Sequence, residues 1–206
     1  MTEAAQKHKT YALREAVNLN DIDAVKELLR QGVDVDERND FDGLTALMLA
    51  SMRGDMELAR LLLENDADVN IKASGGTTAF IFAASSGHTE LASLLLEEGA
   101  EINEKDNLGC TALILAAISG STEAARFLIR KGAEINAKDI LGYTAQMQAE
   151  KRGHTEITQM LQEAAETRQR LIAQAENKCL QHTISARKQE SLRHKARYKP
   201  KPRGLS

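Results

Sequence analysis

The sequence repeats with a period of 33 residues, and this period constrains the fold more than any other feature. Four glycines and four threonines keep the spacing: Gly43, Gly76, Gly109, Gly142, Thr45, Thr78, Thr111 and Thr144. Residues 13–38 align with residues 47–72 at an offset of 34, so one extra residue falls in the loop between Arg38 and Gly43, where an insertion costs little. Such a period indicates a stack of small units that bury their apolar faces against one another.

Each unit contains the signals of two helices followed by a loop. A Thr precedes a short apolar segment such as TALILAAISG, where its hydroxyl can cap the first turn and the closing Gly can end the helix. A second segment, such as STEAARFLIRKG, begins with another Ser or Thr as a second cap and has apolar residues at helical spacing. In the individual units this second segment ends at Gly32, Gly99 or Gly132, or at Asp66 in the second unit; Gly and Asp both tolerate left-handed backbone geometry. Each unit therefore predicts helix–turn–helix–hairpin loop.

This pattern resembles the ankyrin repeat, whose unit of about 33 residues has a T-P-L-H-x-A signature. The resemblance extends from about Lys9 to Gln162 and implies an all-α, ankyrin-repeat solenoid with a C-terminal helical extension. Alanine replaces the Pro of the signature in four units, and the positions of its His are Met48, Ile81, Ile114 and Met147. These apolar replacements favour tight burial in place of the hydrogen bond that the His makes in the family.

The organisation that we expect has three parts. The ankyrin-repeat domain covers residues 1–162, with units at approximately 9–39, 40–72, 73–105, 106–138 and 139–162. A helical extension covers 163–190, and a basic, disordered tail covers 191–206. The terminal units are atypical, as in other solenoids: the fifth has Gln146, Gln148 and Glu150 where inner units have apolar or small residues. We interpret these as polar caps; the alternative is that the fifth unit packs against the following helix.

The extension and the tail allow more than one interpretation. Residues 155–189 contain no Gly or Pro, which predicts one long helix, or two that break near Glu166–Arg168. A helix that caps the last repeat is the favoured role, and self-association or partner binding is the alternative. Residues 187–206, which include this tail, have one acidic residue, Glu190, against eight basic ones: Arg187, Lys188, Arg193, Lys195, Arg197, Lys199, Lys201 and Arg203. A basic tail suits nucleic acid, an anionic membrane or nuclear import machinery, or it serves only as a solubilising segment.

No pattern of residues indicates catalysis. The sequence lacks HExxH, GxSxG, phosphate-loop and CxxC motifs, and His88 and His154 share one repeat position, which favours a structural role in the turn. Cys110 and Cys179 are the two cysteines; we expect Cys110 at the surface and unreactive, in a reducing compartment. We therefore expect no enzyme, no cofactor and no metal. The absence of a signal peptide and of a long apolar run favours the cytoplasm, with a nuclear location or non-classical export as alternatives.

The resemblance implies a protein-binding module with partner-facing positions beside the hairpin glycines and at the ends of the first helices. Carried over residue by residue, the predicted binding positions are Phe41, Asp42, Leu44, Met52, Arg53, Ser85, Ser86, Leu108, Ile118, Ser119, Leu141, Tyr143, Lys151 and Arg152. The same positions also include Ser74, Gly75, Thr77, Asn107, Cys110 and Ile140. Many are apolar where exposure is expected, which is typical of an interaction patch.

The function that we expect is that of a monomeric scaffold or adaptor that binds a protein on the concave face of the solenoid. In one alternative, the basic tail of an adaptor contacts nucleic acid, an anionic membrane or nuclear import machinery. In another, the protein is a bacterial effector that targets a host protein. Self-association through the C-terminal helix is an alternative to the monomer. The partner follows from neither the composition nor the repeat.

Overall fold

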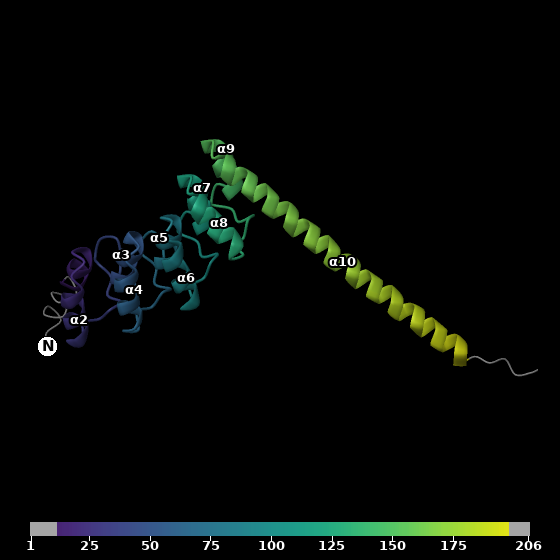
Figure 1. The fold of residues 1–206 in the computed structure, drawn as a ribbon, viewed down its shortest axis with the longest axis horizontal. Coiled ribbons are helices and arrows are strands. Elements are labelled where there is room, and N and C mark those ends of the chain that lie inside the picture. The colour runs from purple at the N-terminus through teal and green to yellow at the C-terminus, as the bar shows by residue number, and fades with distance from the viewer. Residues whose placement is uncertain (1–11, 198–206) are drawn as a thin grey trace, which may run out of the picture. The chain divides into compact units, whose positions relative to one another are not determined.

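The computed structural model describes residues 12–197, and all regular secondary structure in this range is helical (Figure 1). Residues 12–18 form the first helix. The others are α2 (Ile22–Arg30), α3 (Ala46–Arg53), α4 (Met56–Leu63), α5 (Ala79–Ser85), α6 (Thr89–Glu97), α7 (Ala112–Ser119), α8 (Thr122–Arg130), α9 (Ala145–Arg152) and α10 (Thr155–Arg197). The chain divides into two compact units, Met1–Gln162 and Glu163–Ser206, which we describe separately.

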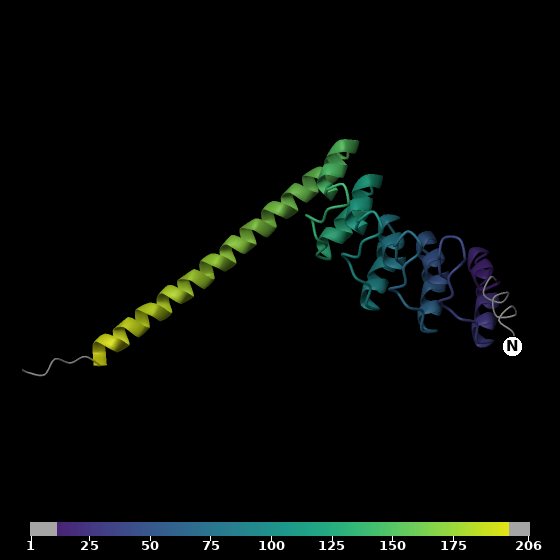
Figure 2. The same cartoon turned by 180° about the vertical axis from the view of Figure 1, so that it is seen from behind.

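The first unit is a stack of helix pairs. Within each repeat, α3 packs against α4, α5 against α6, and α7 against α8. Between repeats, α3 packs against α5, α5 against α7, and α7 against α9, so the first helices form a continuous layer. Both ribbon views show α3, α5 and α7 along one side of this unit and α4, α6 and α8 along the other (Figures 1 and 2). The predicted all-α repeat solenoid is confirmed.

The predicted threonine caps are present at the start of the first helix in the second to fifth repeats. The hydroxyls of Thr45, Thr78 and Thr144 each accept a hydrogen bond of 3.3 Å from the amide three residues later, and that of Thr111 accepts one of 3.4 Å. The corresponding prediction for the second helices is wrong at Ser121, which begins α8 without a side-chain cap bond. The backbone explains the difference, because ψ is 90° at Ser121 and near 166° at Thr111.

The turns after the second helices take left-handed geometry as expected. Asp66 has φ 64°, and the glycines at the same position, Gly99 and Gly132, have φ 94° and 88°. Asn20 has φ 57° in the first repeat, where later repeats have a glycine. Asp66 and Asn20 therefore take the place of Gly in these two turns, because their short polar side chains make the left-handed conformation accessible.

The residues that replace the signature His are buried in the interior repeats but not in the last one. Met48, Ile81 and Ile114 are each 1% exposed, whereas Met147 is 49% exposed. Met147 belongs to the fifth repeat, which has no further repeat stacked on it. Gln148, one of the polar residues of that repeat, is nevertheless 8% exposed, and its amide donates to Asp139 Oδ2 at 3.1 Å.

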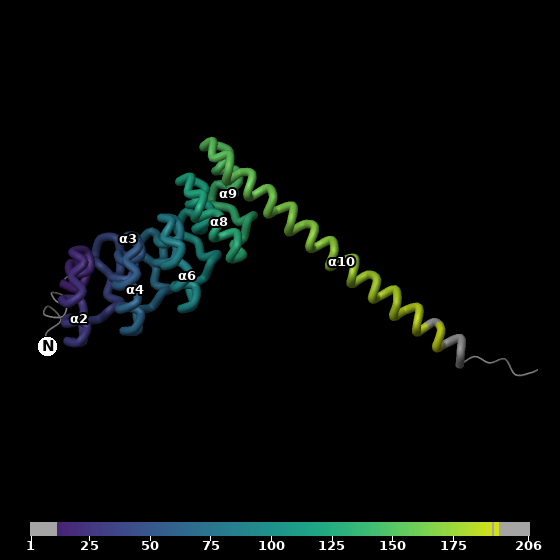
Figure 3. Tube along the Cα trace, viewed as in Figure 1, coloured from purple at the N-terminus to yellow at the C-terminus, as the bar shows by residue number. Residues whose placement is uncertain are grey.

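Helix α10 is a single helix without a break near Glu166–Arg168, and the trace follows it continuously (Figure 3). Ile157 and Leu161, in its first two turns, are 1% and 0% exposed and belong to the core of the repeat unit. Every side chain from Glu166 to Glu190 is exposed. The buried residues of α10 therefore lie before the extension of residues 163–190.

The helix continues to Arg197, so residues 191–197, which we expected in a disordered tail, are helical. The physical reason is that no Gly or Pro occurs between Gly153 and Pro200, and a proline also disfavours helical geometry at the residue before it. Of the predicted basic residues, Lys199, Lys201 and Arg203 lie outside the described residues.

Candidate protein-binding surface

The hairpin loops of the second to fifth repeats are joined in one row by backbone hydrogen bonds. The Ser74 amide donates to Asp42 O at 2.8 Å, the Asn107 amide to Gly75 O at 2.9 Å, and the Ile140 amide to Leu108 O at 3.0 Å. Each bond joins the tip of one hairpin to the tip of the next. The tips therefore form a continuous surface, which we call the hairpin row.

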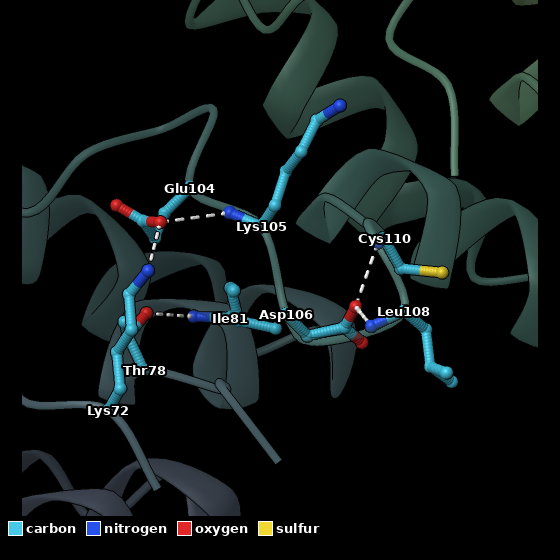
Figure 4. A network of polar contacts seen from close by, with 8 residues as sticks. All are labelled: Lys72, Thr78, Ile81, Glu104, Lys105, Asp106, Leu108 and Cys110. Atoms are coloured by element: carbon cyan, nitrogen blue, oxygen red, sulfur yellow. Dashed lines mark hydrogen bonds and ion pairs between the residues drawn. The ribbon is translucent and has the colours of Figure 1, made fainter. Parts of the chain in front are cut away.

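Side-chain oxygens at the base of three hairpins hold the tips in place. Asp106 Oδ1 accepts from the Leu108 amide at 2.9 Å and from the Cys110 amide at 2.8 Å (Figure 4). Asp139 Oδ1 accepts from the Leu141 and Tyr143 amides at 2.9 Å each. These local bonds replace water at the turn amides, so the loops keep one conformation without a partner.

The second repeat accommodates its extra residue in this loop. Asn39 Oδ1 accepts from three successive amides, those of Phe41, Asp42 and Gly43, at 3.2, 2.8 and 2.8 Å. The loop closes with a bond from the Asn39 amide to Leu44 O at 3.2 Å, one residue wider than the closure from Asp106 to Cys110 at 3.1 Å. The inserted residue therefore widens the hairpin without breaking its anchor.

Electrostatic contacts at the hairpin bases add to this order. Glu104 Oε1 accepts from Lys72 Nζ at 2.5 Å and from the Lys105 amide at 3.2 Å, so it joins the third repeat to the second (Figure 4). The hydrogen bond from Lys72 lowers the pKa of Glu104 against the opposing effect of partial burial. Burial by itself raises the pKa of Asp139, but the bonds donated by Tyr143, Gln148 and Leu141 outweigh it, so this pKa is also lowered.

The structure exposes large apolar side chains along the hairpin row. Phe41 is 91% exposed, Leu108 60% and Leu141 76%, and the neighbouring Ile140 is 67% exposed. Asp42 is also exposed, whereas Leu44 and Tyr143, one position after the hairpin glycine, are half-buried. Of the predicted apolar positions in this row, those at the tips face water and those behind the glycine pack partly inward.

Cys110 does not occupy the surface position that we expected. Its side chain is 5% exposed, and burial, followed by the charges of Asp106 and Asp139, raises the pKa of its thiol to about 11. Residue 110 lies directly before the buried cap Thr111, and the closure of the loop onto Asp106 draws its backbone inward. The thiol is therefore a packing group of the fourth hairpin.

The predicted residues at the ends of the first helices differ in their availability. Met52 is 42% exposed, and Ser86 and Ser119 are also exposed, whereas Ser85 and Ile118 are half-buried. The Ser85 hydroxyl donates to Ile81 O at 2.6 Å, and that of Ser119 donates to Ala116 O at 3.2 Å. These two hydroxyls are already bonded within their own helices.

Arg53 is exposed but already engaged with the first repeat. Its guanidinium donates to Val17 O at 3.1 Å and also to Asn18 O. The sequence analysis placed Arg53 among the predicted binding positions. The structure shows a side chain that caps the last carbonyls of the helix at residues 12–18, a contact that becomes visible only once the repeats are stacked.

The fifth repeat provides the basic end of the surface. Lys151 and Arg152 are exposed at the end of α9, and Lys151 Nζ lies 5.2 Å from the centroid of the Tyr143 ring. The ring face stabilises the ammonium group and keeps it beside the hairpin row.

Two exposed apolar side chains outside the predicted set are Leu19 and Met147; their place in the terminal repeats is the signal that could have identified them.

The two histidines of the GHTE motif lie between repeats, in the structural role that we expected. His88 Nε2 lies 3.2 Å from Met52 O in the preceding repeat. A β-carbon at Gly54 would lie 2.4 Å from His88 Nδ1, and one at Gly120 would lie 2.5 Å from His154 Cε1. The glycines at the ends of α3 and α7 are therefore required by the imidazole packed above each of them as well as by their positive φ.

The described part of the chain has neither a metal-binding cluster nor a membrane-spanning helix. Among residues 12–197, no three or more His, Cys, Asp or Glu side chains are grouped so that they could hold a metal ion. In the same range, no helix has the length and apolar character needed to cross a bilayer.

Comparison with known proteins identifies the repeat. A family model described as ankyrin repeats in three copies matches residues 13–106 and 98–171. Ankyrin repeat domain-containing protein 40 of Mus musculus is 38% identical over 71 residues, which is 34% of this chain and 20% of that protein. The Homo sapiens protein of the same name is also 38% identical over 71 residues, 34% of this chain and 19% of that protein.

A plant protein shows a similar level of likeness. Potassium channel AKT3 of Oryza sativa subsp. japonica is 41% identical over 63 residues, 31% of this chain and 7% of that protein. The chain thus spans at most a fifth of the length of these relatives. Ankyrin repeats are generally protein-binding modules. Because the family model matches all of residues 13–171 in two overlapping segments and these residues show its helix pairs and hairpins, the chain belongs to the ankyrin-repeat family.

Proposed function

We propose that the repeat domain is a non-enzymatic scaffold that binds a protein partner along the hairpin row and the adjacent ends of the first helices, on the concave face of the solenoid. The observation that carries this proposal is the exposure of Phe41, Leu108, Ile140 and Leu141 on hairpins that are tied to one another. Large apolar side chains that are gathered in one row mark interaction surfaces, whereas isolated ones do not.

The rigidity of the row supports the proposal independently of its composition. The tips of the second, fourth and fifth hairpins are held by Asn39, Asp106 and Asp139, as described above. A loop that already has its bound conformation loses little conformational entropy when a partner arrives. Burial of the exposed apolar area at these tips would therefore contribute to the free energy of binding with little loss to the ordering of the loops.

The layout of the row indicates the kind of protein that fits it. Phe41 and Met52 form one apolar end, and Leu108, Ile140 and Leu141 form the other. The third repeat between them has only the small residues Ser74, Gly75, Ser85 and Ser86 at the same positions. Lys151 and Arg152 follow beyond the second apolar end. A partner with two apolar anchors, a bulge between them and an acidic group near the fifth repeat would be complementary.

The proposal is tested by comparing partner capture by two triple variants in the native cell. The first variant, Phe41→Asp, Leu108→Asp and Leu141→Asp, changes the hairpin row. The matched control, Leu171→Asp, Leu180→Asp and Leu192→Asp, changes residues of α10 that are 61%, 56% and 59% exposed. Both sets lie at the surface, so the thermal unfolding of the repeat domain should remain unchanged.

Proximity labelling and affinity capture then discriminate the outcomes. Proteins retained by the wild type and the control but lost by the hairpin-row variant support the proposal. If the hairpin-row variant captures the same proteins as the wild type, the row is not the binding surface. If only the control loses them, the partner binds α10 instead.

A further inference from the structure

Helix α10 carries a strong and one-signed charge over its second half. From Lys178 to Arg197 the sequence has six Lys or Arg residues and one acidic residue, Glu190, a formal net charge of +5. This stretch is helical throughout, and the side chains of Lys178, Arg187, Lys188 and Arg193 are exposed. Twenty helical residues span about 30 Å. We call this stretch the basic rod.

The basic side chains surround the rod. With a helical rotation of about 100° per residue counted from Leu171, Lys178, Arg187, Lys188 and Arg193 fall at roughly 340°, 160°, 260° and 40°. No quadrant of the helix is therefore far from a positive charge. A flat anionic surface meets only one side of such a rod, so a membrane or the face of an acidic protein would leave about half of these charges unused.

The apolar side chains of the basic rod do not form a face free of charge. Leu180, Ile184 and Leu192 are 56%, 51% and 59% exposed and fall at roughly 180°, 220° and 300° around the helix, with Lys188 between the last two at roughly 260°. Before the rod, Leu171 and Ile172 fall at roughly 0° and 100°, away from this arc. An amphipathic helix that lies in a membrane interface needs a continuous apolar face, and a coiled-coil seam needs apolar residues at heptad positions. The interleaved charge and the change of face along α10 disfavour both an interfacial membrane helix and self-association through a helical seam.

A surface that encloses a helix from both sides fits this distribution. The major groove of B-form DNA is about 12 Å wide, admits one α-helix and has a phosphate backbone along each wall. The same groove in double-stranded RNA is deep and narrow and excludes a helix. Lys178–Arg197 contains no Phe, Tyr or Trp, so it lacks the stacking side chains that single-stranded nucleic acid requires.

We propose that the basic rod of α10 binds double-stranded DNA by lying in the major groove, with contacts to phosphates on both walls and without base-sequence preference. DNA carries one negative charge per about 1.7 Å of its axis, so phosphates are dense along both walls of the groove. This inference is independent of the protein-binding role of the hairpin row, because it rests on a different part of the chain. It predicts binding that falls steeply as salt rises.

The test measures binding of the full chain to a fluorescein-labelled DNA duplex of about 20 base pairs by fluorescence anisotropy, at about 50 mM and about 200 mM salt. Two duplexes of different base composition are compared. A rod variant carries Lys178→Gln, Arg187→Gln, Lys188→Gln and Arg193→Gln. A matched control, Lys26→Gln, Arg30→Gln, Arg60→Gln and Arg130→Gln, removes the same charge from exposed positions on α2, α4 and α8.

The proposal predicts that the wild type binds both duplexes equally. The rod variant should lose at least about tenfold in affinity, and its salt slope should fall by up to about 3.6, or about 0.9 for each lost phosphate contact. The control should stay within about twofold of the wild type. Glutamine is a good helix former, and far-ultraviolet circular dichroism confirms that α10 remains helical.

Three results would overturn the proposal. The first is no binding of either duplex at about 50 mM salt, where charge-driven binding is strong. The second is an equal loss of affinity in the rod variant and the control, which would indicate a response to net charge alone. The third is tighter binding to another anionic ligand than to the DNA duplexes. Tighter binding to phosphatidylserine vesicles would favour a flat anionic surface, and tighter binding to an RNA duplex of equal length would exclude the major groove as the binding site.

Discussion

Replacing Gly54 with Ala tests whether the imidazole of the next repeat acts as a lock between the second and third repeats. Gly54 ends α3 at φ 73°, and a β-carbon there would lie 2.4 Å from His88 Nδ1. At this separation the ring must move away. The movement breaks the contact of 3.2 Å between His88 Nε2 and Met52 O, which joins the two repeats.

The expected loss in the free energy of unfolding has two parts. An Ala in left-handed geometry costs roughly 1–2 kcal/mol, and the displaced ring adds about 1 kcal/mol for the lost hydrogen bond and about 1 kcal/mol for an unfavourable rotamer. Gly32→Ala isolates the first part, because Gly32 has φ 72° and nothing within 4 Å of its would-be β-carbon. We therefore expect Gly54→Ala to lower the free energy of unfolding by about 2 kcal/mol more than Gly32→Ala does.

Urea unfolding followed by circular dichroism measures both free energies of unfolding. Repeating the comparison in a His88→Ala background provides a double-mutant cycle, in which the additional loss at Gly54 should nearly disappear. Equal destabilisation by the two glycine substitutions in the wild-type background would refute the steric argument. So would an additional loss at Gly54 that persists without the imidazole, because the lock would then not involve His88.

Three further predictions follow from the caps, the ion pair and the thiols. Thr111→Ala should lower the free energy of unfolding by about 1 kcal/mol, whereas Ser121→Ala should change it by less than about 0.5 kcal/mol because Ser121 makes no cap bond; urea unfolding measures both. The pKa of Glu104 is lowered in the folded state. Its contribution to the free energy of unfolding is therefore complete above its ordinary pKa and is lost as the pH falls through the lowered value. Glu104→Gln should reduce this loss of stability in acid, which unfolding curves measured from neutral to low pH would show. At mildly alkaline pH a thiol reagent should modify the exposed Cys179 quickly in the folded protein. Cys110 should react only after unfolding, because burial raises the pKa of its thiol to about 11. Rapid reaction of both thiols in the folded protein would contradict the burial of Cys110.

Local interactions account for the parts of the fold that the sequence predicts well. The threonine caps join atoms only three residues apart, as at Thr78 and Ile81, and the left-handed conformation of Asp66 is a property of one residue in its own turn. Such features repeat wherever the residues repeat. The 33-residue period therefore specifies the helix pairs and the hairpins before any packing is known.

The candidate site was less predictable, because its properties depend on neighbours one repeat away. Arg53 is a predicted binding position, but its guanidinium donates to carbonyls 35 and 36 residues earlier. Cys110 lies at a position with surface character in the repeat, yet it is buried. The sequence lists the residues beside the hairpin glycines, and only the stacked repeats determine which of them face water.

The sequence by itself therefore determined the repeat, its helices and the threonine caps of the first helices, because these depend on contacts within one turn or one unit. It also determined that α10 is long, because no Gly or Pro occurs between Gly153 and Pro200. The tertiary structure decided two other matters: that Phe41, Leu108 and Leu141 face water, and that His88 closes over Gly54. Both depend on hydrogen bonds and contacts between units, which a period cannot reveal.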